Sequence, residues 1–389
     1  MGAEKMTENT KYWVWLSLVL GPSTKNEEIL YAFPEPKKLY EASERDIMIT
    51  GALTKRQFEK LGEVKLEDAE KIIEKCEKYG WEIVTPEDKI YPAGLRKLND
   101  MPLALYVDGD ISCLRGKVII AVVGTRKPCY ESVAIARKIS SDLAKAGAVV
   151  VSGGALGIDS AAHEGALEVK GKTVCVLGCG LGFDYLRDNE ALRREISRNG
   201  ALVTEYPPMT GASRRTFPAR NRIISGMSHG VLVVEAGEKS GSLITAQRAS
   251  EQARDVYAIP GSILTTAYNG ANALIRDGAK AVAGARDILT PYSVIYPDRL
   301  NLDAIGDEPI KVEISGEKEK PQFVKKQLAP GLDPDCETVY NLFGEETVHP
   351  DDICAESGLS LSRVITALMQ LQMADYIESD GGKNYKVKN

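Results

Sequence analysis

The chain has 389 residues, of which 43% are apolar, and a formal net charge of −6. This length predicts two or three domains, and this apolar content predicts a globular protein with a substantial core. The acidic balance excludes a uniformly basic nucleic-acid coat, so an anion has to bind at a local basic patch. The first residues lack the layout of a signal peptide, and the apolar run 14–20 is too short to cross a bilayer. We therefore expect a cytoplasmic protein that does not enter a membrane.

Cysteine and histidine usage argues against a metal centre. The seven cysteines include no C-x-x-C pair, and the only histidines are His163, His229 and His349. Because no metal-ligand spacing emerges from these residues, the sequence predicts neither a bound metal nor another cofactor.

Residues 1–80 are predicted to form a small helical domain. Amphipathic runs alternate with turn signals such as Gly21-Pro22, and Ala69, Ile72 and Cys76 lie at helical spacing. The predicted helices cover residues 13–20, 26–32, 36–42, 55–61 and 65–78. The domain resembles sterile-alpha-motif and helix-hairpin-helix modules, although the glycine pair of the latter is missing.

Residues 81–305 form the predicted core, in which apolar runs alternate with helices. These runs cover residues 118–123, 148–151, 173–177, 201–204, 231–234 and 256–259. Strands without polar alternation are buried on both faces, which predicts an α/β fold with a mostly parallel, doubly wound sheet of extended Rossmann type. Ligands of such sheets bind beyond the carboxyl ends of the strands.

Glycine-rich turns follow several of these predicted strands at their carboxyl ends. Glycine lets backbone N–H groups approach an oxyanion closely, and a following helix N-terminus favours negative charge. Because several such turns converge on one edge, they predict a surface for phosphate groups. The turns are Gly124-Thr125-Arg126, Ser152-Gly153-Gly154 and Ser240-Gly241-Ser242.

The segment 213–236 adds cations and an aromatic ring to this edge. It contains Arg214, Arg215, Arg220 and Arg222 around Phe217, without an acid in its first third. Arginine pairs bidentately with phosphate oxygens, and an aromatic ring can stack on a base. A basic and aromatic cluster at the end of a buried strand is therefore typical of a site for a polyanion with flat bases.

The remaining chain is divided into a linker, 306–331, and an end domain, 332–389. The linker has mixed charge and little apolar periodicity. Three helices followed by a hairpin predict a winged-helix domain. Its third helix, 360–371, offers only Arg363, which argues against strong duplex binding.

No catalytic arrangement is predicted. Gly171-Lys172-Thr173 precedes a strand and lacks the spacing of a P-loop, and the first strand is not followed by a dinucleotide-binding glycine motif. His163 and Asp159 are the only candidates for acid–base chemistry. Asp159 is better explained by a helix N-terminus, and His163 by a core or rim position.

The motifs taken together resemble the DNA-processing protein A (DprA, also called Smf) family. In order and spacing the resemblance covers roughly residues 91–279, and the motif combination is highly specific. The matching stretches are Val123-Gly124-Thr125-Arg126, Ser152-Gly153-Gly154-Ala155-Leu156-Gly157-Ile158-Asp159, Leu177-Gly178-Cys179-Gly180-Leu181, Thr204-Glu205-Tyr206-Pro207, Phe217-Pro218-Ala219-Arg220-Asn221-Arg222-Ile223-Ile224, Ser240-Gly241-Ser242 and Pro260-Gly261-Ser262.

The resemblance implies a non-enzymatic protein that binds single-stranded DNA and forms a homodimer through its Rossmann-like core. It also implies loading of a RecA-type recombinase onto the strands during natural transformation. The family's DNA-contacting arginine, basic position and stacking ring correspond to Arg126, Arg214 and Phe217. The expected DNA-binding residues are Gly124, Thr125, Arg126, Ser152, Gly153, Gly154, Arg214, Phe217, Arg220, Asn221, Arg222, Ser240, Gly241 and Ser242.

The sequence departs from the family pattern near the third strand of the core. Glu131, Gly182, Leu186 and Glu190 replace residues that are common in members, and the last two weaken the basic rim. The compensating cations available there are Arg187, Arg193 and Arg194.

The sequence leaves two alternatives to single-stranded DNA binding. One is a nucleotide-binding or phosphoribohydrolase-type enzyme, which would use Glu235 and the turn at Ser240-Gly241. The other is a winged-helix transcription regulator, which the uncharged third helix disfavours.

Overall fold

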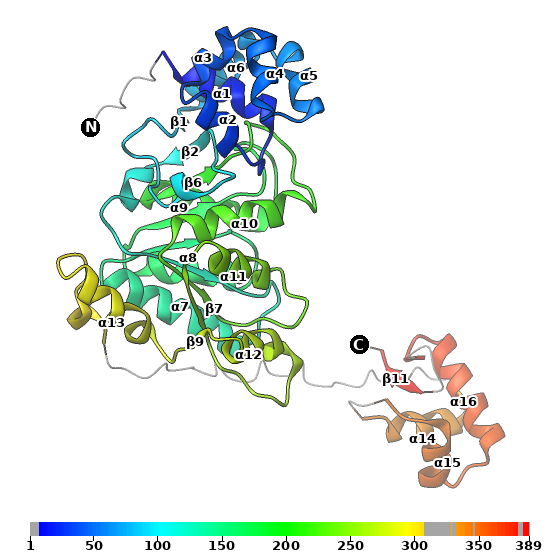
Figure 1. The fold of residues 1–389 in the computed structure, drawn as a ribbon. Helices are drawn as coiled ribbons and strands as arrows, with labels where there is room; N and C mark the ends of the chain where they lie inside the picture. The colour runs from blue at the N-terminus through cyan, green and yellow to red at the C-terminus, as the bar shows by residue number, and fades with distance from the viewer. Residues whose placement is uncertain (1–7, 307–327, 329–331, 345–346, 380–383, 389) are drawn as a thin grey trace. The chain divides into compact units, whose positions relative to one another are not determined.

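The structure, a computed structural model, describes residues 8–306, 328, 332–344, 347–379 and 384–388. Its contacts divide the chain into two compact units, Met1–Lys311 and Val312–Asn389 (Figure 1). Apart from residues 306 and 328, the predicted linker lies outside the described residues.

Six helices precede the sheet. Five of them correspond to the predicted amphipathic runs, and α4 is additional. Ser43 is its N-cap residue, and the Ser43 hydroxyl accepts a hydrogen bond from the Asp46 N–H. A serine in this position is a common sequence signal for the start of a helix. The helices are α1 (Thr10–Leu20), α2 (Glu27–Ala32), α3 (Pro36–Glu41), α4 (Glu44–Thr50), α5 (Lys55–Glu63) and α6 (Leu66–Tyr79).

The six predicted apolar runs all form strands of one mostly parallel sheet, which confirms the predicted fold class. They are β3 (Ile119–Val123), β4 (Val149–Ser152), β5 (Thr173–Val176), β6 (Ala201–Thr204), β7 (Gly230–Val233) and β8 (Asp255–Ala258). The whole sheet has nine strands in the order β1-β2-β6-β5-β4-β3-β7-β8-β9. The pairs from β6 across to β9 are parallel.

The sheet also has edge strands that the apolar pattern does not specify. At one edge β1 (Glu82–Val84) pairs antiparallel with β2 (Leu105–Gly109), and β2 pairs antiparallel with β6. At the other edge lies β9 (Lys280–Ala281), whose two residues are both exposed. Strands this short carry no periodicity that sequence reading could detect.

Helices cover both faces of the sheet, as Figure 1 shows. One apolar cluster joins alternate strand residues such as Val151 and Val233 to Ile223 and Ala246 of two helices on one face. A second joins Ile120 and Leu232 to helices on the opposite face. The helices of the core are α7 (Tyr130–Lys145), α8 (Ile158–Glu168), α9 (Glu190–Asn199), α10 (Thr216–Met227), α11 (Ser242–Glu251), α12 (Asn269–Arg276) and α13 (Ala285–Ile295).

The N-terminal helices share a third apolar cluster with the sheet. Trp15 and Leu16 of α1 belong to the same cluster as Tyr106 of β2 and Leu202 of β6. The helices and the sheet therefore bury one another and lie in a single compact unit.

In the part of the C-terminal unit that the structure describes there are three helices and a two-stranded sheet. These are α14 (Pro334–Leu342), α15 (Pro350–Ser357), α16 (Leu361–Met373), β10 (Ile377–Ser379) and β11 (Tyr385–Val387). The two strands pair antiparallel, as predicted for the hairpin, whose expected turn at 380–382 lies outside the described residues.

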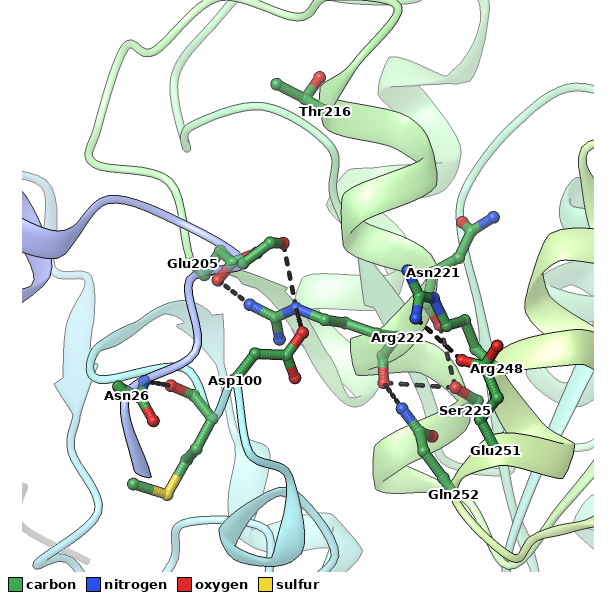
Figure 2. Close-up of polar contacts among 12 residues, drawn as sticks. Asn26, Asp100, Glu205, Thr216, Asn221, Arg222, Ser225, Arg248, Glu251 and Gln252 are labelled. Atoms are coloured by element: carbon green, nitrogen blue, oxygen red, sulfur yellow. Dashed lines mark hydrogen bonds and ion pairs between the residues drawn. The ribbon is translucent and has the colours of Figure 1, made fainter. Parts of the chain in front are cut away.

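A buried ion pair on α10 connects three parts of the first unit (Figure 2). The Arg222 side chain is 3% exposed, and its Nη2 lies 2.5 Å from the Glu205 carboxylate, which is 4% exposed. Its Nε lies 3.2 Å from Asp100 and donates to the Ser23 hydroxyl. Burial raises the pKa of Glu205, while the Arg222 guanidinium acts in the opposite direction. Arg222 thus holds the N-terminal helices, the connecting segment and the sheet together.

We expect Arg222→Ala to lower the free energy of unfolding by about 3–5 kcal/mol at pH 7, because it leaves the Glu205 carboxylate buried without its partner. Urea unfolding measures this loss. The matched control is Arg215→Ala, since Arg215 is exposed at the N-cap of the same helix and its replacement should cost less than about 0.5 kcal/mol.

The loss should also depend on pH. Without Arg222, the folded-state pKa of Glu205 lies still further above its usual 4.5, so the folded protein holds a proton that the unfolded chain releases. Stability of the variant relative to wild type therefore falls as pH rises through that window. Equal losses at pH 5 and pH 7 would contradict this explanation.

Candidate functional site

A pocket of about 290 Å³ lies at the carboxyl edge of the sheet, where the order of strands changes direction. From β3 the chain first builds β4, β5 and β6 on one side and later β7, β8 and β9 on the other. The loops after β3 and β7 therefore separate, which is where open α/β sheets bind ligands. The loop after β3, the turn after β4 and the first turns of α10 and α11 line the pocket.

The structure brings nine of the fourteen predicted site residues to this pocket. They are Gly124, Thr125, Arg126, Phe217, Arg220, Asn221, Ser240, Gly241 and Ser242. Sequence reasoning missed several further lining residues, among them Ala155, Ile224 and Thr245. The helical spacing of Ile224 from Asn221, and of Thr245 from Ser242, places each on the same helix face as a predicted residue.

Arg220 forms the floor of the pocket. It is buried, and its Nη1 donates to the carbonyl oxygen of Gly153 at 2.7 Å and to that of Val176. Its Nε donates to Asn221 Oδ1 at 3.2 Å. A Cβ at position 153 would lie 2.5 Å from the guanidinium, so glycine leaves room for the Arg220 side chain in this position. Arg220 therefore joins the ends of β4 and β5 to α10 and still presents positive charge to the pocket.

Asp159 supplies a counter-charge beside Arg220. It lies in the first turn of α8 and accepts hydrogen bonds from the N–H groups of Gly153 and Ala155, at 3.2 and 3.3 Å. Burial raises the pKa of Asp159, and the Arg220 guanidinium acts in the opposite direction. Asp159 thus lies at a helix N-terminus, as the sequence favoured, and its hydrogen bonds fix the turn after β4.

Phe217 is half-buried at the pocket mouth and contacts two potential stacking partners. The Arg126 guanidinium carbon lies 5.3 Å from the ring centroid, and the Tyr185 ring lies 5.2 Å away at an angle of 39°. A Cβ at position 178 would come within 2.7 Å of the ring, so Gly178 makes room for it. The result is a cationic and aromatic surface, to which Tyr185 is an unpredicted addition.

Four of the other predicted residues lie outside the pocket lining for different reasons. Gly153 and Gly154 form the turn behind Arg220, and Ser152 is buried with its hydroxyl donating to the Val122 carbonyl. Arg214 is exposed just before α10, and within the described residues it makes no hydrogen bond or ion pair. Its charge is available to a ligand that extends beyond the pocket.

Arg222 is the predicted residue that the structure places elsewhere. Figure 2 shows its side chain leaving α10 toward Glu205 and Asp100, whereas Asn221 projects from a different side of the helix. Because each helix residue is rotated by about 100° from the one before it, Arg222, two residues after Arg220, points about 200° away from it, and the two cannot both face the pocket. The expectation that Arg222 contacts DNA is therefore replaced by the structural role described above.

Two groups that an enzymatic alternative would use, His163 and Glu235, lie away from solvent, whereas Ser240 and Gly241 line the pocket. His163 is fully buried, its Nδ1 is 2.7 Å from the Thr173 hydroxyl, and burial lowers its pKa to about 3. The Glu235 carboxylate is buried and accepts a hydrogen bond from the Cys129 N–H at 2.9 Å. Glu235 is thus committed to the start of α7 and does not line the pocket.

Backbone dipoles add to the positive character of the pocket. The N-termini of α8, α10 and α11 meet at this edge, and each contributes partial positive charge. Together with Arg126 and Arg220 they outweigh Asp159. The arrangement can hold an anion with an attached flat ring, because oxyanions meet cations and N–H groups while the ring meets Phe217.

Other candidate centres are limited. In the ranges that the structure describes, no three His, Cys, Asp or Glu side chains gather as metal ligands, and no helix has the length and apolar character of a membrane span.

In the C-terminal unit the Arg363 guanidinium of α16 donates to the Asp335 carboxylate at 2.7 and 2.6 Å. The one arginine of the predicted recognition helix is therefore already paired.

Comparisons with known proteins find family matches in both units of the chain. The family model for DNA recombination-mediator protein A matches residues 82–293, and that for the DprA winged helix domain matches residues 324–383. The DNA processing protein DprA of Bacillus subtilis is 41% identical over 200 residues, which is 51% of this chain and 67% of the relative.

Two solved structures are also similar. The X-ray structure of DNA processing protein A from Streptococcus pneumoniae matches with a TM-score of 0.63 and 34% identity, over 74% of this chain and 98% of that one. The Helicobacter pylori protein, whose structure was described for its single-stranded DNA binding mode, matches with a TM-score of 0.50 and 31% identity, over 55% and 97%. On the family models and these identities, the chain belongs to the DNA recombination-mediator protein A family.

Proposed function

We propose that this protein binds single-stranded DNA at the switch-point pocket, defined by Arg126, Phe217, Arg220 and the first turn of α11, and delivers it to a RecA-type recombinase. The observation that carries the proposal is the contact of the Arg126 guanidinium with the Phe217 ring at the pocket mouth. A phosphate and its base could be held there at once. No covalent chemistry is required of the pocket.

The binding residues in this proposal form two groups. Arg126, Arg220 and the N-terminal turns of α10 and α11 hold phosphate groups in the pocket, and exposed Arg214 extends the cationic track outside it. Phe217 stacks on a base, which is tolerant of sequence because every base has a π-face. The Helicobacter pylori relative supports this reading, since its structure concerns single-stranded DNA binding.

The first test is a titration with fluorescent oligo-dT, a duplex of equal length and dTMP. Oligo-dT should bind most tightly, because a single strand presents unpaired bases together with phosphates. The duplex should bind more weakly, since its bases are already stacked and the lone arginine of α16 is paired. Preference for dTMP with release of free base would instead support a nucleotide-cleaving enzyme.

The proposed homodimer has a candidate surface between β8 and α12. Ile263 and Leu264 are 87% and 95% exposed there, and adjacent large apolar side chains on a surface favour association. Leu264→Asp should then shift the sedimentation of the protein from dimer to monomer without changing its melting temperature. A wild-type monomer, or an unchanged dimer in the variant, would remove this surface from the proposal.

Binding should weaken as salt rises, with a log–log slope of about −0.7 for each phosphate neutralised. Arg126→Ala and Arg214→Ala should each flatten the slope by a fraction of a unit, because each removes one cation from the path of the strand. Arg45→Ala, which removes an exposed charge from α4, is the matched control and should leave the slope unchanged. Unchanged slopes in both Arg126→Ala and Arg214→Ala would place the DNA elsewhere.

Phe217→Ala should weaken oligo-dT binding by about 1–3 kcal/mol if the ring stacks on a base. Loss of affinity at an unchanged melting temperature supports stacking. Phe217→Leu separates the two roles, since leucine fills space beside Gly178 but has no π-face. Restoration of both affinity and stability by leucine would show that Phe217 serves only to pack the loop.

Recombinase delivery needs its own measurement. Filament assembly by a RecA-type recombinase on a strand covered by single-strand-binding protein should accelerate when this protein is added. The Phe217→Ala variant should accelerate it less, because it holds the strand less firmly. Equal acceleration by the two proteins would separate delivery from the pocket.

A further inference from the structure

A second basic pocket, of about 380 Å³, lies at the amino edge of the parallel sheet. It is lined where β3 and β7 begin, at Ile119 and just before Gly230, and by Arg254 directly before β8. Parallel strands that begin together form the edge opposite to their carboxyl ends. This amino-edge pocket is therefore separate from the switch-point pocket.

Four exposed cations line the amino-edge pocket without any counter-charge. Within the described part of the chain, the side chains of Lys89, Lys97, Arg115 and Lys117 make no hydrogen bond or ion pair, and no Asp or Glu is among the lining residues. The neighbouring acid, Asp88, accepts hydrogen bonds from the N–H and hydroxyl of Thr85. A chain with a net charge of −6 thus gathers unpaired positive charge in one hollow.

Three further arginines line the same pocket and are held by neutral groups. Arg96 donates to the carbonyl oxygens of Pro86, Asp88 and Tyr91. Arg254 donates to those of Gly94 and Gly226 at 3.3 and 3.1 Å, and Arg299 lies 4.4 Å from the Tyr296 ring centroid. Carbonyls and rings fix the direction of a guanidinium and leave its charge uncompensated.

The helix dipoles explain why some, but not all, of these cations lie at this edge of the sheet. The C-termini of α10 and α11 reach this edge, and their partial negative charge favours a cation such as Arg254. The effect fades within the last turn, however, and Lys89, Arg115 and Lys117 lie outside the last turn of any α-helix. Burial also lowers the pKa of Arg254, so an anion at this position would relieve an existing electrostatic cost.

We propose that the amino-edge pocket binds phosphate groups as a second site, independent of the switch-point pocket. Its volume falls in the range of small-ligand sites, and several cations converge on it, as oxyanions with several charges require. His229 suits the same ligand, because its Nδ1 accepts the Ile119 N–H and leaves the proton on Nε2 to be donated. The phosphates could come from a free nucleotide or from the backbone of a DNA strand.

Isothermal titration of the full chain with tripolyphosphate tests the site. Wild type should bind it saturably, and Lys97→Glu/Lys117→Glu should weaken binding by about tenfold or more, because two attractive charges become repulsive. Lys55→Glu/Lys75→Glu makes the same charge change on exposed residues of α5 and α6 and should leave binding intact. Circular dichroism should show both variants folded.

Arg126→Ala distinguishes the two pockets. It should retain tripolyphosphate binding even where it weakens oligo-dT binding, so the second site can stand if the proposed function fails. No saturable binding in wild type, equal weakening in the two lysine pairs, or loss in Arg126→Ala alone would each overturn the proposal.

Competition in the Arg126→Ala background identifies the source of the phosphates. Displacement of tripolyphosphate by oligo-dT supports a second contact with the strand, and displacement by ATP alone supports a nucleotide site. Displacement by neither would overturn the assignment to phosphate esters.

Discussion

The geometry of the switch-point pocket depends on one buried cation. The Arg220 guanidinium donates to main-chain oxygens at the ends of β4 and β5 and lies beside the Asp159 carboxylate. Burying an unpaired arginine would cost several kcal/mol, so these partners must stay in place as long as the fold persists. The turn after β4 and the first turns of α10 are thereby held in fixed register. Phe217 lies three residues before Arg220 on the same helix, so the contacts of Arg220 also fix the position of the Phe217 ring.

The arginines in and directly before helix α10 point in three different directions. Arg215 is exposed at the start of the helix, Arg220 faces the sheet edge and Arg222 pairs with Glu205 on another side. The rotation of an α-helix separates these directions. One short segment thus connects the N-terminal helices to the sheet and also lines the pocket. A substitution in it can therefore reduce ligand affinity through stability alone.

Both edges of the parallel sheet carry local positive charge in an acidic chain, but they are built differently. At the carboxyl edge a few cations are combined with helix N-termini and an aromatic ring, which suits a base-bearing strand. At the amino edge, helix C-termini supply no N–H groups, so lysine and arginine side chains alone provide the charge. The first arrangement favours shape and stacking, whereas the second depends on charge number and should be more sensitive to salt.

The sequence by itself determined the parallel sheet, because continuous apolar runs such as that of β3 are compatible only with burial on both faces. It also located the glycine turns, which are local patterns, whereas the Arg126–Phe217 combination was expected from the family resemblance, since the two residues lie far apart in sequence. The sequence did not predict short edge strands such as β9, since two residues are too few to show a hydrophobic periodicity. Only the tertiary structure decided that Arg222 pairs with Glu205 while Arg220, two residues earlier, lines the pocket. Those partners lie far apart in sequence, and the direction of a helical side chain matters only once its neighbours are in place. The amino-edge pocket was equally hidden, because its cations come from segments that meet only where strands begin together.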